Sequence, residues 1–190
     1  MQTLTFGRDF NQSIDQVSLP SNLQNLTFGQ HFNQSMDGVS LPSNLQTLTF
    51  SSDFNRSLDK VTLPSNLQTL AFGRDFSHIL DGTILPSNLQ SLTFGEGFQP
   101  ELGRRHNLVE QSSKLDIGLG IQPELGWYNL AQQSSKHFNQ RLDGVALPSN
   151  LQSLTFGRGF SQKLDGTTLP INLQSLTFGG YFNQSLDGTT

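Results

Sequence analysis

The amino-acid sequence predicts a β-rich solenoid whose 22-residue coils form a parallel sheet, with little or no regular α-helix outside residues 99–136. The first observation is a motif, Leu-Pro-Ser-Asn-Leu-Gln-x-Leu-Thr-Phe, which returns along most of the 190 residues at a step of 22. The second is that all 15 phenylalanines fall on two positions of this repeat. A residue type confined in this way is expected to pack against its own copies in neighbouring coils.

Each repeat opens with a segment that predicts a short strand. The spacing Leu45-x-x-Leu48-x-Phe50 is that of the strand in leucine-rich repeats, so the solenoid is expected to be leucine-rich-repeat-like. Leu48 and Phe50 should point into the interior, and Thr47 and Thr49 outward, because side chains alternate along a strand. The units begin at Leu23, Leu45, Leu67, Leu89, Leu151 and Leu173.

The residues after each strand predict a turn and a return path. A glycine such as Gly73 is expected to end the strand by taking a positive φ. Phe54 and Leu58 should then fill the interior on the way back. Asp37-Gly38 predicts a turn. Copies of its aspartate stand at Asp81, Asp143, Asp165 and Asp187.

A second short strand is predicted where each coil closes, at Val39-Ser40-Leu41 in one copy and at Thr167-Thr168-Leu169 in another. The proline that follows, Pro42 in the first of these, cannot donate a ladder hydrogen bond. The proline is therefore expected to stop the second strand.

Two columns of asparagines are expected to stack along the solenoid. Side-chain amides stacked in this way can satisfy backbone groups that tight turns leave unpaired, which we favour over a ligand-binding role. One column holds Asn44, Asn66, Asn88, Asn150 and Asn172, and the other holds Asn11, Asn33, Asn55, Asn139 and Asn183.

The motif Phe-Asn-Gln-Ser-Leu-Asp-Gly-Val-Ser-Leu-Pro-Ser-Asn-Leu-Gln-Thr-Leu-Thr-Phe-Gly resembles the FNIP repeat, a relative of the leucine-rich repeat. Nearly complete copies stand at Phe32–Phe50, Phe54–Phe72, Phe138–Gly157 and Phe160–Gly179. The resemblance covers about four-fifths of the chain. It implies a solenoid that makes protein–protein contacts, often as one part of a larger protein, and it implies no catalytic residues.

The repeat pattern is interrupted between residues 99 and 136. Within this stretch Gln99-Pro100-Glu101-Leu102-Gly103 recurs at positions 122–126, and Gln111-Ser112-Ser113-Lys114 recurs one repeat length later, at positions 133–136. Codons for Phe-Asn-Gln-Ser-Leu-Asp-Gly-Val-Thr read from the third base of the first codon give Gln-Pro-Glu-Leu-Gly-Arg-Arg-His, which is the order of residues 99–106. We therefore interpret 99–136 as repeat DNA read out of frame, in preference to an inserted binding loop. The predicted organisation is a solenoid block at 1–98, an irregular segment at 99–136 and a second block at 137–190, together one continuous array without caps.

Composition argues against several classes of function. Charged residues make up 14% of the chain and the net charge is −4, with no basic cluster, so nucleic acid is not expected as a partner. The absence of a long apolar run and of a signal peptide argues against membrane partners and favours a cytoplasmic location. Cysteine is absent, and no phosphate-binding loop, nucleophile motif or histidine pair with metal-ligand spacing is present. We expect neither catalytic residues, nor a cofactor, nor a metal site.

The candidate binding surface combines the outward threonines of the strands with the irregular residues that follow them. A constant scaffold beside varied exposed residues is how repeat proteins form extended binding surfaces, so we expect a protein-interaction module with an unidentified protein partner. The candidate residues are Thr5, Arg8, Asp9, Thr27, Gln30, His31, Thr47, Thr49, Ser52, Asp53, Arg74, Asp75, Thr155, Arg158, Thr177 and Tyr181.

Two alternatives to a protein-interaction module remain open. Threonine ladders on a flat parallel coil could bind ice or another ordered surface, although Asn25 and Ala71 interrupt them. The chain could also be a non-functional fragment, or a gene-model product, of a larger repeat protein. The sequence shows no polar cap at either end, so end-to-end self-association is a further expectation.

Overall fold

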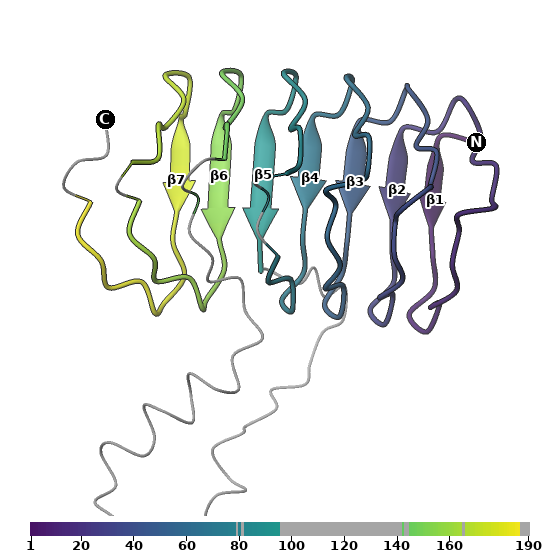
Figure 1. Cartoon of the computed structure of the whole chain (residues 1–190), viewed down its shortest axis with the longest axis horizontal. Coiled ribbons are helices and arrows are strands. Elements are labelled where there is room, and N and C mark those ends of the chain that lie inside the picture. Colours follow the sequence, from purple (N-terminus) through teal and green to yellow (C-terminus); the bar gives the residue numbers. More distant parts are fainter. Residues whose placement is uncertain (79, 81, 96–141, 143–144, 165, 187–190) are drawn as a thin grey trace, which may run out of the picture. The chain divides into compact units, whose positions relative to one another are not determined.

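The computed structural model describes residues 1–78, 80, 82–95, 142, 145–164 and 166–186. Seven short strands run parallel in one sheet, and their order in the sheet follows the chain (Figure 1). The strands are β1 (Thr3–Thr5), β2 (Asn25–Thr27), β3 (Thr47–Thr49), β4 (Thr69–Ala71), β5 (Ser91–Phe94), β6 (Ser153–Phe156) and β7 (Ser175–Thr177). No helix occurs in these ranges, which confirms the predicted leucine-rich-repeat-like β-solenoid.

The strands alternate inward and outward side chains as the sequence predicts. In β3, Leu48 is fully buried whereas Thr47 and Thr49 are half-exposed. Phe50, directly after the strand, is buried as well. The register between neighbouring strands aligns each leucine with the leucine of the next coil, as in Leu48 with Leu70. The leucines therefore form a continuous column beneath the sheet.

The phenylalanines form two stacked columns in the interior. Within one coil, the rings of Phe50 and Phe54 lie 3.9 Å apart, and between coils Phe50 lies 5.3 Å from Phe28 and 5.7 Å from Phe72. These four rings, together with Leu58 on the return path, are at most 1% exposed. The prediction that phenylalanines pack against their own copies is confirmed for the described coils.

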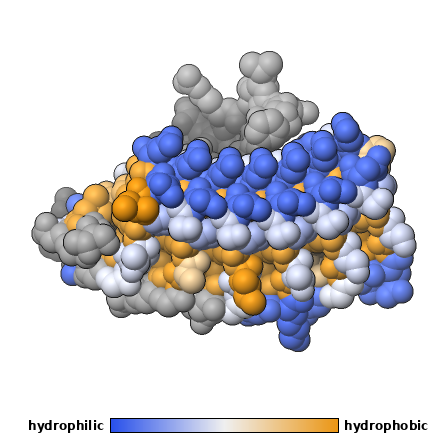
Figure 2. Space-filling model, turned by 90° about the horizontal axis from the view of Figure 1, so that it is seen from above, coloured by the Kyte–Doolittle hydropathy of each residue, from blue (hydrophilic) through white to orange (hydrophobic). Residues whose placement is uncertain are grey.

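Both asparagine columns satisfy backbone groups of a neighbouring coil. Asn66 Nδ2 donates to the carbonyl of Ser43 at 2.9 Å, and Asn44, Asn88, Asn150 and Asn172 make the same bond to the preceding coil. In the second column, Asn33 Oδ1 accepts the backbone N–H of Asn55 at 3.0 Å. The predicted structural role is confirmed for the first column and for Asn11, Asn33 and Asn55 of the second; it stays a prediction for Asn183, and Asn139 lies outside the described residues. Figure 2 looks onto the turns before the strands, where hydrophilic residues form a continuous band.

The Asp-Gly turn is confirmed where it is described. Val39 N donates to Met36 O at 3.1 Å across Asp37-Gly38, and Gly38 has a φ of 77°. Gly166 has a φ of 78° at the corresponding position. This left-handed conformation is easily reached by glycine, which has no Cβ. Asp81, Asp143, Asp165 and Asp187 lie outside the described residues.

The predicted second strand is wrong. Residues 39–41 and 167–169 form no strand. The turn that begins at Met36 closes only when Val39 donates its N–H back, and Pro42 follows soon after. The N–H of Val39 is thus used within the turn, and Pro42 has no N–H to donate to a ladder.

The predicted reason for Gly73 is also wrong. Gly73 has no positive φ; instead, a Cβ at this position would collide with the backbone of Ser51 in the preceding coil. Gly29 and Gly157 are equally restricted, and a Cβ on Gly157 would lie 2.7 Å from the carbonyl carbon of Gly95. We call this position of the repeat the glycine column; its glycines allow the close approach of successive coils, although Ser51 stands in the same column. Gly95 alone among its described members has a positive φ, of 74°.

Strands β5 and β6 pair across a long sequence interval. Ser91 aligns with Ser153, whereas in the other neighbouring pairs the aligned residues come from consecutive repeats, as with Thr47 and Thr69. Residues 96–141 lie outside the described residues, so the predicted irregular segment and the division of the chain into blocks remain predictions.

Candidate functional site

The residues that follow each strand line one edge of the sheet. We call the two positions after the glycine column the strand-end columns. Among the described residues, the first column holds Arg8, Gln30, Ser52, Arg74, Arg158 and Gly180, and the second holds Asp9, His31, Asp53, Asp75, Gly159 and Tyr181. The sequence differs more from coil to coil here than at the strand leucines or the turn prolines.

Backbone hydrogen bonds hold the strand-end columns in register. His31 N donates to Arg8 O at 3.0 Å, and Asp53 N donates to Gln30 O at 3.1 Å. The same bond joins Asp75 N to Ser52 O at 2.8 Å. Because the backbone is fixed independently of the side chains, this edge can present different side chains on one framework.

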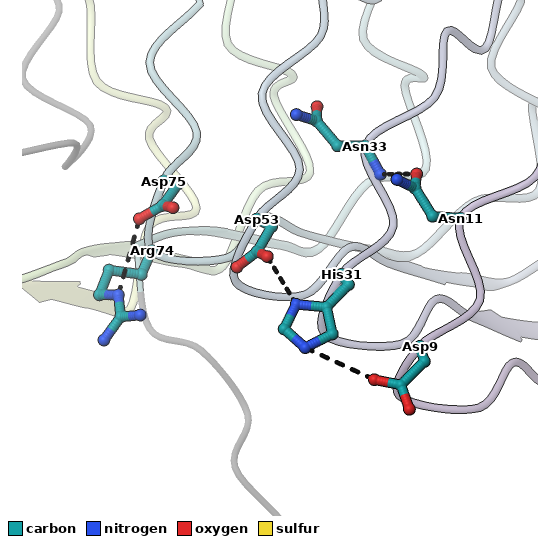
Figure 3. A network of polar contacts seen from close by, with 7 residues as sticks. All are labelled: Asp9, Asn11, His31, Asn33, Asp53, Arg74 and Asp75. Carbon is teal, nitrogen blue, oxygen red and sulfur yellow. Dashed lines mark hydrogen bonds and ion pairs between the residues drawn. The ribbon is translucent and has the colours of Figure 1, made fainter.

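His31 bridges two carboxylates from the coils on either side of it (Figure 3). Its Nδ1 lies 2.8 Å from Asp53 Oδ2, and its Nε2 lies 3.6 Å from Asp9 Oδ1. The Asp9 side chain is 86% exposed and that of His31 is 40% exposed. The three residues therefore form a polar row on the surface that runs across three coils.

Two further contacts extend the columns. Arg74 Nε lies 3.6 Å from Asp75 Oδ1 within one coil, and the guanidinium of Arg158 lies 5.5 Å from the centre of the Tyr181 ring. Tyr181 is 63% exposed. Exposed cations, carboxylates and a tyrosine are thus presented together at the strand ends.

One residue of the predicted surface is not at the surface. Ser52 is only 6% exposed. A Cβ on Gly73 would lie 2.6 Å from Ser52 N, which shows how closely the next coil covers this short side chain. We therefore remove Ser52 from the candidate surface.

The outward strand residues lie beside the strand-end columns. Thr5 and Thr177 of the end strands are exposed, whereas Thr27, Thr47, Thr49 and Thr155 are half-exposed. The register aligns these side chains from strand to strand, and Asn25 Nδ2 donates to Thr3 Oγ1 at 3.3 Å. Asn25, Ala71, Ser91, Ser153 and Ser175 interrupt the threonine columns.

Sequence reasoning missed a set of side-chain bonds on the return path. Gln34 Nε2, Arg56 Nε and His78 Nε2 lie 3.1, 2.9 and 3.2 Å from the backbone carbonyl of the asparagine one coil earlier. The signal that could have revealed them is that these residues, which occupy one position of the repeat, can all donate a hydrogen bond.

Near β1, the first return path contains a carboxylate with a shifted pKa. Ser13 Oγ donates to Asp15 Oδ1 at 2.7 Å, and Gln16 Nε2 approaches Asp15 Oδ2 at 3.4 Å. These hydrogen bonds, that of Ser13 first, lower the pKa of Asp15 below its usual value. Asp15 is exposed, and the side chains bonded to it come from neighbouring residues of its own turn, so the shift reflects turn geometry.

Neither a metal-binding cluster nor a membrane-spanning helix is found in the part of the chain that the structure describes. Across the ranges given above, no group of three His, Cys, Asp or Glu residues is placed to hold a metal ion. Within the same ranges, no helix has the length and apolar character needed to cross a membrane.

Comparison with known proteins supports the class of protein that the fold defines, a leucine-rich-repeat-like solenoid. The chain is similar to CroV588, described as a novel circular LRR protein, with 27% identity and a TM-score of 0.61. The similarity covers 96% of this chain but only 24% of CroV588. No curated protein sequence matches the chain.

The family follows from matches to the FNIP Repeat model. The matched residues are 2–31, 10–53, 54–97, 138–166 and 160–188. They cover most of the chain, which therefore belongs to the FNIP repeat family. The resemblance read from the motif is confirmed.

Proposed function

We propose that the chain is a non-catalytic scaffold that binds a protein partner through the strand-end columns and the adjoining outward strand residues. The observation that carries the proposal is a contrast between the two edges of the sheet. At the edge before the strands, Asn44, Asn66 and Asn88 repeat one residue and use it for the same bond to the preceding coil. At the edge after the strands, the backbone bonds repeat while the side chains change.

The exposed strand-end groups suit a polar, charged partner surface. Arg8, Asp9 and Arg74 are exposed, and the Arg74 side chain is 52% exposed. Charged groups of both signs at fixed spacing favour specificity over bulk affinity, because a partner must match their order. Tyr181 adds an aromatic side chain, a type enriched in protein interfaces.

The proposal is tested with two triple variants on the same scaffold. The first, Arg8→Ala/His31→Ala/Arg74→Ala, removes strand-end side chains from three coils. The matched control, Gln46→Ala/Gln68→Ala/Gln90→Ala, removes exposed side chains at the opposite edge. Both variants should keep the thermal unfolding midpoint close to that of the wild type.

The readout is quantitative affinity capture of proteins by each variant. We expect a defined set of proteins to bind the wild type and the glutamine variant, and to be lost from the strand-end variant. Equal capture by both variants, or loss from both, would refute the assignment of this edge. The alternative of ice or ordered-surface binding stays a prediction, and a thermal hysteresis measurement on the wild type tests it.

A further inference from the structure

The outer faces of the first and last described coils carry an unpaired strand edge and partly exposed phenylalanines. Among the described residues, β1 pairs only with β2, and β7 pairs only with β6 (Figure 1). Phe6 and Phe10 beside β1, and Phe178 and Phe182 beside β7, are only partly buried, whereas interior rings such as Phe50 are 1% exposed or less. Unpaired strand edges with apolar side chains favour pairing with another chain.

The two faces are complementary rather than alike. Between interior coils, Thr47 N donates to Gln24 O at 3.0 Å, and Phe28 N donates to Thr49 O at 2.9 Å. The groups equivalent to Thr47 N and Thr49 O on β1 belong to Thr3 and Thr5. The groups equivalent to Gln24 O and Phe28 N beside β7 belong to Gln174 and Phe178. The first face therefore offers the partners that the last face lacks.

Strands β5 and β6 show that two coils can pack in this way even when the chain that links them is longer than one repeat. Their coils are separated by the long interval between Phe94 and Ser153, yet Gln152 N donates to Gln90 O at 2.9 Å, and the rings of Phe94 and Phe156 lie 5.9 Å apart at 8°. The contiguous pair β3 and β4 has a ring distance of 5.7 Å, also at 8°. The packing of one coil on the next is therefore kept when the linking chain is much longer than one repeat.

We propose that the chain associates head to tail with a second copy of itself, the β7 face of one copy docking on the β1 face of the next. Thr3 N would donate to the carbonyl of the partner's Gln174, and Thr5 O would accept the N–H of the partner's Phe178. Asp9 would face the partner's Tyr181, so no like charges meet in that column. Because the two faces differ, the contact is heterologous and continues as a row or closes as a ring.

The glycine column supplies a sharp test. A Cβ on Gly29 would collide with the backbone of Gly7, but a Cβ on Gly7 would meet nothing within 4 Å inside the chain. In the head-to-tail contact, Gly7 takes the position of Gly29 and lies against the partner's Gly179. Ser51 shows that a small side chain fits in this column, because its Oγ donates to Phe28 O at 2.7 Å. The test therefore uses valine, whose side chain is larger and branched at Cβ. Gly7→Val should leave the single chain intact and block docking.

The matched control is Gly180→Val. Gly180 also has nothing within 4 Å, but its column carries Arg8, Gln30 and Arg74 in stacked coils, so a side chain there is compatible with docking. Molar mass is measured over a range of concentrations by light scattering for the wild type and both variants. The expected result is a mass that rises above 21.0 kDa with concentration for the wild type and for Gly180→Val, and a constant mass for Gly7→Val.

Several outcomes would overturn the proposal. The first is that the wild type has the molar mass of one chain at every concentration. The second is that Gly7→Val associates as strongly as the wild type, and the third is that Gly7→Val still forms a dimer. The last result would indicate a different surface. Circular dichroism checks that Gly7→Val is folded, and Thr3→Pro, which removes the proposed donor, replaces it if it is not. Thr3→Ala keeps the donor and should associate as the wild type does.

Discussion

The first coil and the interior coils are built from equivalent residues, yet the same residues are packed differently in the two. Phe50 stacks on rings of the coils on both sides, whereas Phe6 stacks on one neighbouring coil, through Phe28. Gly73 closely approaches the preceding coil, whereas Gly7 has open space in that direction. The comparison teaches that a repeat of this kind is stabilised mainly by contacts between coils.

The largest expected difference between the two regions is in the phenylalanines. Phe50→Ala should reduce the free energy of unfolding by about 3–5 kcal/mol, because it leaves a cavity among stacked, buried rings. Phe6→Ala should cost clearly less, since its ring is already partly exposed. Urea denaturation of both variants measures the difference, and equal losses would contradict the comparison.

The glycine column should give the next largest difference. Gly73→Val forces a side chain against the backbone of Ser51, and overpacking of this kind costs about 1–3 kcal/mol. Gly7→Val, studied at a concentration where the chain is monomeric, should change stability by less than about 0.5 kcal/mol. Thermal and urea unfolding of the two valine variants provide the measurement. A destabilised Gly7→Val would mean that the first coil is more constrained than its contacts indicate.

A smaller difference is expected from the asparagine column. Asn66→Ala removes a 2.9 Å hydrogen bond to Ser43 O, and such a bond contributes about 0.5–1.5 kcal/mol. Asn22, the corresponding residue one coil earlier than Asn44, only accepts a 3.4 Å contact from the N-terminal amine. Asn22→Ala should therefore be nearly neutral in the same unfolding experiment. Comparable destabilisation by both substitutions would argue that the amide acts through the unfolded chain.

The smallest expected effect concerns Asp15. Ser13→Ala removes the hydrogen bond that contributes most to its lowered pKa, so the pKa should rise toward its ordinary value. A carboxylate with a lowered folded-state pKa stabilises the fold above its unfolded pKa, and this stabilisation is lost as the pH falls through the folded pKa. The variant should lack part of that pH dependence. Titration of the side-chain carboxyl carbon by NMR measures the shift, and an unchanged pKa would exclude Ser13 as its cause.

Much of the fold could be predicted because its strongest signal is periodic. Leu48 and Phe50 recur at one spacing, and only an interior shared between coils explains that confinement. The second strand at Val39-Ser40-Leu41 could not be rejected from its residues alone, because the limiting factor is how the preceding turn closes. The role of Gly73 was also hidden, since a glycine needed for close approach looks the same in sequence as one needed for positive φ.

The place of the candidate site on the sheet edge could be predicted from the sequence, but the contacts between its side chains could not. The strand-end columns were identified from their irregularity, and Asp9, His31 and Asp53 do follow one another along the sheet edge. The bridging position of His31 depends on side-chain conformations, and the burial of Ser52 depends on the neighbouring coil. Neither property is contained in the spacing of the repeat.

The pairing of β5 with β6 has a consequence for how the chain folds. Most neighbouring coils meet after a single repeat, but Ser91 must find Ser153 across a much longer stretch of chain. In a flexible chain, closing a loop roughly three times as long costs about 0.9 kcal/mol more in entropy. Assembly is therefore expected to begin separately on the two sides, from contacts of short sequence separation, and the joining of β5 to β6 is expected to be the late kinetic event.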